Sequence, residues 1–168
     1  MDKPKLVITD SQAFQEVAAV VPQDVMLTSF SILLARYKGS LEPFVQGAAQ
    51  LARLHDGDRV VVSEGCSHHR QCEDIGTVKL PAWIHSYCGA KPAFEFTSGT
   101  EFPADISSAK LVLHCGGCML NDKEMAYRVQ SAQKAGVPIV NYGIAIAQMH
   151  GILKRSLEPF PQVARMLD

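Results

Sequence analysis

The chain has 168 residues, 47% of them hydrophobic and 20% charged, so it can bury the core of a globular domain. Its 16 Lys and Arg residues against 17 Asp and Glu residues give a net charge of −1, which argues against a protein that binds nucleic acid through its phosphates. Met1-Asp2-Lys3-Pro4 has no apolar signal segment, and no apolar run approaches the roughly 20 residues that span a bilayer. We therefore expect a cytoplasmic protein without a membrane partner, whose thiols stay reduced.

Short apolar runs alternate with amphipathic stretches along the chain. In chain order, the pattern predicts a strand at residues 6–9, a helix at 12–21, a strand at 25–28, helices at 31–37 and 41–51, a strand at 59–63, a helix at 81–88, strands at 93–96 and 110–113, a helix at 122–135, a strand at 139–142 and a helix at 144–157. Strands separated by helical lengths indicate an α/β fold, with a parallel sheet flanked by helices and right-handed crossovers.

Polar residues mark the beginnings of several predicted helices. Ser11 and Ser40 can each cap the helix that follows, and Asn121 with Glu124 resembles a capping box. The stretch 64–76 follows the predicted strand at 59–63, and its polar composition predicts irregular structure.

Five cysteines and six histidines are the residues best suited to chemistry. An odd number of cysteines in a reducing compartment argues against a disulfide framework, which leaves metal binding as the main question. Neither a dinucleotide-binding glycine motif nor a nucleophile–base motif is present, so we expect no enzymatic activity from the chain.

Cys115-Gly-Gly-Cys118 spaces two thiols so that both can reach one metal centre. The pair follows an apolar strand and precedes a helix, and open α/β sheets place their ligand sites at such strand ends. The start of a helix also favours thiolates and anionic groups. Cys66 follows the strand at 59–63 in the same way, so three thiols converge if the two strands are neighbours. His68 and His114 lie beside these cysteines in the sequence.

The thiol pattern alone leaves three kinds of site open. A structural zinc site needs four ligands, which Cys66 with His68 or Cys72 could complete. Three thiols with one weaker ligand suit an iron–sulfur cluster that has one exchangeable iron, and we favour this hypothesis. A thiol–disulfide enzyme would need only Cys115 and Cys118. The other thiols and imidazoles are interpreted as structural or surface residues: Cys72, Cys88, His55, His69, His85 and His150.

The same motifs resemble a known family. Cys66-Ser-His68, a gap of 45 residues and then His114-Cys115-Gly-Gly-Cys118 are similar to the C-terminal region of the [FeFe]-hydrogenase H-cluster maturation GTPases. The resemblance covers nearly the whole chain and includes residues 28–39, 64–69, 74–79, 114–121 and 136–143.

The resemblance implies a Rossmann-like domain that binds a [4Fe–4S] cluster through Cys66, Cys115 and Cys118. It also implies a labile fourth ligand, for which His68 is the first candidate and Asp74 the second, with Cys72 or an exogenous group as further choices. Proteins of this family scaffold a diiron precursor that carries CO and cyanide and deliver it to the hydrogenase. The implied partners are therefore the [FeFe]-hydrogenase and the two radical enzymes of the maturation system.

The sequence departs from the family in one respect. It contains no G-x-x-x-x-G-K-[ST] phosphate-binding loop, so we expect no GTP binding in this chain, either because it is a truncated form or because it is naturally short. The resemblance then divides the chain into residues 1–30, a remnant of the dimerisation domain, and residues 31–168, the cluster-binding domain. A homodimer is expected from the same comparison.

Overall fold

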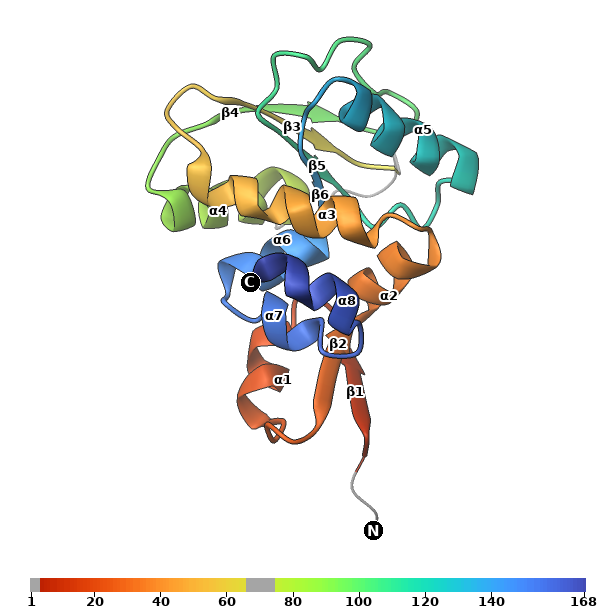
Figure 1. Ribbon diagram of the computed structural model, residues 1–168. Helices are drawn as coiled ribbons and strands as arrows, with labels where there is room; N and C mark the ends of the chain where they lie inside the picture. The colour runs from red at the N-terminus through yellow and green to blue at the C-terminus, as the bar shows by residue number, and fades with distance from the viewer. Residues whose placement is uncertain (1–3, 66–74) are drawn as a thin grey trace.

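Two parallel sheets organise the computed structural model, which describes residues 4–65 and 75–168 (Figure 1). The larger sheet has four strands in the order β4-β3-β5-β6. Its strands are β3 (Arg59–Ser63), β4 (Ala93–Thr97), β5 (Leu111–His114) and β6 (Ile139–Asn141). The smaller sheet pairs β1 (Leu6–Thr9) with β2 (Met26–Ser29). The predicted α/β class with parallel strands is confirmed, although the strands form two sheets.

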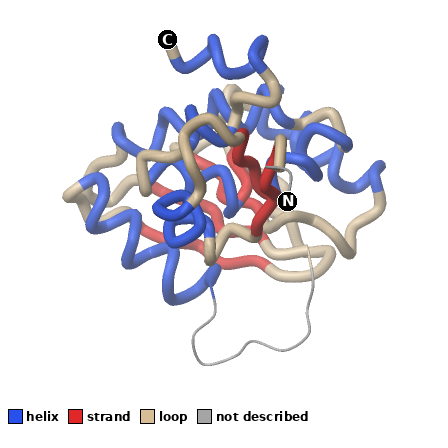
Figure 2. The backbone as a smooth tube through the Cα atoms, turned by 90° about the horizontal axis from the view of Figure 1, so that it is seen from below, coloured by secondary structure: helices blue, strands red, loops and turns tan. Residues whose placement is uncertain are grey.

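Eight α-helices cover these sheets in the described part of the chain. They are α1 (Phe14–Val20), α2 (Phe30–Tyr37), α3 (Leu41–Ala48), α4 (Leu80–Cys88), α5 (Asp122–Lys134), α6 (Tyr142–Met149), α7 (Leu153–Ser156) and α8 (Pro161–Ala164). Figure 1 shows α5 on one side of the four-stranded sheet and α3, α4 and α6 on the other, between that sheet and the β1–β2 unit. Viewed at right angles, the strands lie near the middle of the molecule, with helices and loops around them (Figure 2).

The central strands are buried on both faces, which explains their unbroken apolar sequences. Val60, Val61 and Val62 of β3 are at most 1% exposed, and Leu111 to Leu113 of β5 are fully buried. Helices on both sides exclude water from such a sheet, so neither strand alternates between apolar and polar residues. The register of the ladders places Thr97, Ser63, His114 and Asn141 in one row at the carboxyl edge of the sheet.

Two details of the predicted elements are wrong. The single helix expected at 144–157 is divided into α6 and α7, because Gly151 adopts a left-handed φ of 73° between them. Ser11 does not cap α1. The side chain of Asp10 accepts the N–H groups of Gln12 and Ala13 instead, and Ser11 hydrogen-bonds to Ser31.

The remaining differences are a missing cap bond and two short helical segments that the sequence pattern did not predict. Ser40 stands at the N-cap of α3 but its side chain makes no cap bond there. Residues Ile75–Lys79 form a π-helical turn, where the end of an irregular segment was expected. The rest of that expected irregular segment, 66–74, lies outside the described residues. Helix α8 begins at Pro161 and was not predicted.

Candidate metal centre

The carboxyl edge of the four-stranded sheet positions the cysteine loop. Strands β3 and β5 are direct neighbours, with Ser63 opposite His114. The predicted convergence of the three thiols requires these two strands to be adjacent. Cys115 comes directly after β5, and Gly65 comes two residues after the end of β3. The backbone N–H of Cys115 still donates to the carbonyl of Ser63 at 2.9 Å, so the ladder continues into the loop.

Cys115 is held by backbone N–H groups from both strand ends. Its half-buried Sγ accepts the N–H of Gly65 at 3.0 Å and the N–H of Gly117 at 3.4 Å. Hydrogen bonds to sulfur favour the charged thiolate, which is the form that binds metal. The bond from Gly65 also connects the segment that leads to Cys66 with the loop that carries Cys115.

Two glycines give the loop its shape. Gly117 has a φ of 65°, a left-handed conformation that side chains rarely adopt. A Cβ at Gly65 would lie 2.7 Å from Cγ of Leu120, so a larger residue there would require the Leu120 side chain to move. Cys118 lies in the turn after Gly117 and is exposed, and its neighbour Met119 is 67% exposed. One thiol of the pair is therefore cradled and the other faces solvent.

A buried arginine lies behind the loop. Arg128 of α5 is fully buried, and its Nε donates to Glu124 at 2.8 Å. Its Nη1 lies 3.1 Å from both Ser63 Oγ and His114 Nε2, and its Nη2 donates to the carbonyl of Gly99 at 2.8 Å. The guanidinium also lies 5.3 Å from the centre of the Phe102 ring. The row of strand ends is extended by Thr97, whose Oγ1 donates to Ser63 at 3.1 Å.

His114 is buried and neutral. Burial lowers the pKa of His114 to about 4. The hydrogen bond to the Cys115 carbonyl raises this pKa, whereas the charges of Arg128 and Lys38 lower it further. Its Nδ1 lies 2.6 Å from that carbonyl oxygen, and its Nε2 faces Arg128. Both ring nitrogens therefore have partners within the protein.

A second cation supports the loop from the other side. Lys38 follows α2, and its side chain is 9% exposed. Its Nζ donates to the carbonyl oxygens of Gly117 at 2.8 Å and Leu120 at 3.4 Å, and it lies 3.9 Å from the exposed carboxylate of Asp122. Lys38 places its positive charge directly on the loop, which suits an anionic group on the thiols, whereas Arg128 is paired with Glu124 and lies behind His114.

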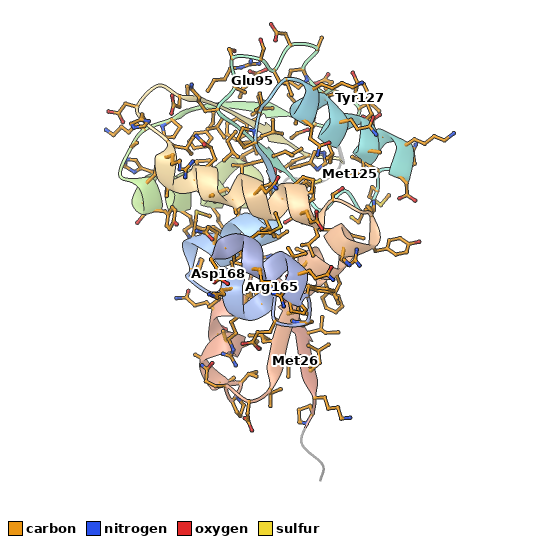
Figure 3. The ribbon with its side chains drawn as sticks, viewed as in Figure 1. Met26, Glu95, Met125, Tyr127, Arg165 and Asp168 are labelled. Atoms are coloured by element: carbon orange, nitrogen blue, oxygen red, sulfur yellow. The ribbon has the colours of Figure 1, made fainter. Side chains whose placement is uncertain are left out.

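Lys38, Arg128 and Ser63 are not among the site residues predicted from the sequence. For Arg128 a signal was present, because it shares the buried stripe of α5 with Met125, Val129 and Ala132 at helical spacing. Figure 3 shows Met125 on the inner side of α5 and Tyr127 on the outer side. An arginine on the inner side of an amphipathic helix indicates a buried polar partner.

The predicted ligands are only partly described. Cys115 and Cys118 share one loop, and His114 lies directly behind it. Cys66, His68, Cys72 and Asp74 lie outside the described residues, so the metal site of Cys66, Cys115 and Cys118 stays a prediction. Among residues 4–65 and 75–168, no three His, Cys, Asp or Glu side chains group closely enough to hold a metal ion.

The other predicted structural residues have ordinary surroundings. Cys88 is half-buried and packs against the core, with its Sγ 3.8 Å from the Ala90 carbonyl. His150 meets Trp83 edge to face and hydrogen-bonds to Gln15. His55 is 83% exposed at its side chain, next to Asp58. None of these side chains is part of the cysteine loop.

The fold and the loop define a parallel α/β protein that presents a cysteine pair at the carboxyl end of a central strand. The family model described as the hydrogen maturase F tetramerization domain matches residues 42–159, and the one described as the hydrogen maturase F dimerization domain matches residues 1–39. The chain therefore belongs to the hydrogen maturase F family. No curated protein matches the chain. The predicted division at residue 30 stays a prediction.

The two matched domains give the chain a role in hydrogenase maturation and support homo-oligomerisation. Both are named for subunit association, and neither is named for catalysis. Within the described residues, every helix is too short or too polar to cross a membrane.

Proposed function

We propose that this chain is a cluster-binding scaffold and carrier in the assembly of the diiron centre of [FeFe]-hydrogenase. The loop after β5 and the segment after β3 would hold a [4Fe–4S] cluster through Cys115, Cys118 and Cys66. The observation that carries the proposal is the bond from the Gly65 N–H to Cys115 Sγ, because it brings the two cysteine-bearing segments together at one edge of the sheet.

The described residues fit such a cluster. A cubane held by three thiolates is anionic, and Cys115 already receives two N–H donors while Lys38 places a positive charge on the loop. The exposed Cys118 leaves one side of the loop open to solvent and to a partner. When bound, the cluster supplies one iron with an exchangeable ligand, for which His68, Asp74 and Cys72 are the candidates in this chain and an exogenous group is the alternative.

The residues of the chain perform three tasks in this proposal. The end of β5 places the loop of Cys115 and Cys118 beside Gly65, the glycines let backbone N–H groups approach the Cys115 sulfur, and Lys38 places a positive charge on the loop. The cargo is a diiron precursor with CO and cyanide ligands, and the partners are the hydrogenase and the two radical maturation enzymes. The proposed location is the cytoplasm.

Anaerobic reconstitution with iron and sulfide tests the proposal. Wild-type protein should take up about four irons per chain and give the EPR signal of a reduced cluster. Cys115→Ser should lose both, whereas Cys88→Ser, which changes a half-buried thiol outside the loop, should keep both. One tightly held zinc per chain, with no iron after anaerobic reconstitution, would replace the proposal with a structural zinc domain.

A further inference from the structure

Arg128 is an unusual residue for its position on α5. It is fully buried on the same helical stripe as Met125 and Val129. Burying a cation costs several kcal/mol, and an apolar side chain of similar volume in such a place is often as stable or more stable. Stability alone therefore does not explain an arginine at this position. Its contacts converge on the carboxyl ends of β3 and β5, at Ser63 and His114.

The hydrogen-bonding chemistry of Arg128 fixes the state of His114. A guanidinium can only donate, so the Nε2 of His114, 3.1 Å from Arg128 Nη1, must accept. The ring proton of the neutral imidazole is then on Nδ1, which donates to the carbonyl of Cys115 at 2.6 Å. Neither ring nitrogen has a lone pair left for a metal.

We infer that Arg128 is a positioning residue that acts through His114: it holds the imidazole as the Nδ1–H tautomer, which orients the Cys115 peptide and keeps its Sγ in place to bind a metal. His114 is then a hydrogen-bonding support and not a ligand. The orientation of the Cys115 peptide decides whether its Sγ meets the N–H groups of Gly65 and Gly117. This inference rests in part on the proposed function, since it assigns a metal to the loop.

Two measurements on the full 168-residue chain test the inference. The first is the nitrogen–proton NMR correlation of the imidazoles in metal-free wild-type protein, where His114 should appear as the Nδ1–H tautomer. The second is the affinity for zinc alone, measured against a competing chelator. Arg128→Met should weaken zinc binding by about 10- to 100-fold, the usual cost of losing a partner that orients a ligand.

Arg155→Met is the matched control. Arg155 of α7 also directs its guanidinium to backbone carbonyls, those of Ala18, Val21 and Pro22, but these belong to the end of α1 and the turn after it. This variant should keep wild-type zinc affinity and the wild-type His114 tautomer. Arg128→Lys keeps the charge but offers one nitrogen in place of the three that contact Glu124, Gly99 and the Ser63–His114 pair, so it cannot reproduce the fixed position of the guanidinium and should weaken zinc binding as well.

The outcomes separate the inference from the proposed function. A His114 that is protonated on Nε2 in wild-type protein overturns the inference, and this result needs no variant to fold. Equal zinc affinity in folded Arg128→Met or Arg128→Lys and in Arg155→Met also overturns it. A wild-type chain that binds zinc but no iron and sulfide refutes the proposed function and leaves the positioning role of Arg128 in place.

Discussion

Replacing Lys38 with methionine removes the cation that supports the cysteine loop and leaves the loop sequence unchanged. The Nζ of Lys38 donates to the Gly117 carbonyl at 2.8 Å and, more weakly, to that of Leu120 at 3.4 Å. A hydrogen bond to a charged group contributes about 1.5–3 kcal/mol to stability. The ion pair with Asp122 adds little, because that carboxylate is 79% exposed and the atoms are 3.9 Å apart.

The predicted destabilisation is large enough to measure by thermal unfolding. For a chain of this size, 1 kcal/mol lowers the melting temperature by roughly 2–4 °C, so Lys38→Met should melt about 3–12 °C below wild type. Lys123→Met is the control, since Lys123 lies exposed in the first turn of α5. The loss of iron from the reconstituted protein to a chelator should also be faster in Lys38→Met. Equal melting temperatures for the two variants would refute the assignment of Lys38 as a support of the loop.

Three further predictions follow from single contacts. Gly117→Ala should cost about 1–2 kcal/mol in urea unfolding because of its left-handed φ of 65°. Gly116→Ala should cost little, because among the described residues its Cβ would meet only Leu34, at an ordinary contact distance of 3.7 Å; equal costs would contradict this. Asn141→Ala should lower the free energy of unfolding by about 2 kcal/mol, because the buried Asn141 side chain accepts the N–H of Ile144 and donates to the carbonyl of Ser31. Asn121→Ala, which removes an exposed helix cap, should lower it by only about 1 kcal/mol. A larger loss for Asn121→Ala would contradict this reasoning. In metal-free protein, the fold should be most stable above pH 6.5 and should lose up to about 3 kcal/mol of unfolding free energy as the pH falls to 4, because the lowered pKa of His114 means that the unfolded chain binds the proton more tightly. His114→Gln should show a weaker dependence of stability on pH. An unchanged dependence would exclude His114 as its source.

The parts of the fold that were predictable are those set by local chemistry. The apolar runs of β3 and β5 are continuous because both faces are covered, and Asn121 caps α5 through a bond that its own sequence neighbours supply. The break between α6 and α7 was missed because an amphipathic pattern continues across Gly151, and only its backbone conformation ends the helix. The pairing of β1 with β2 in a separate sheet depends on packing that no local pattern contains.

The candidate site was predictable in its chemistry but not in its support. Cysteine spacing and strand ends located Cys115 and Cys118 on one loop at the carboxyl edge of the sheet. Lys38 contacts a residue 79 positions away and Arg128 contacts Ser63 across 65 positions, so both contacts arise only when the chain folds. A lysine or arginine that forms buried hydrogen bonds is the same residue type as one on the solvated surface. A sequence pattern distinguishes the two only when, as with Arg128, the charged residue interrupts an apolar stripe.

The support of the cysteine loop crosses the boundary between the two family domains. Lys38 lies in the range matched by the dimerization domain, and it holds the carbonyls of Gly117 and Leu120, which lie in the range matched by the tetramerization domain. The side-chain amide of Asn141 donates to the Ser31 carbonyl across the same boundary. Because the loop rests on Arg128 from one range and on Lys38 from the other, neither domain alone contains all the contacts that shape it. Lys38 therefore links the packing of the dimerization segment to the cysteine loop by direct hydrogen bonds, and Lys38→Met removes this link.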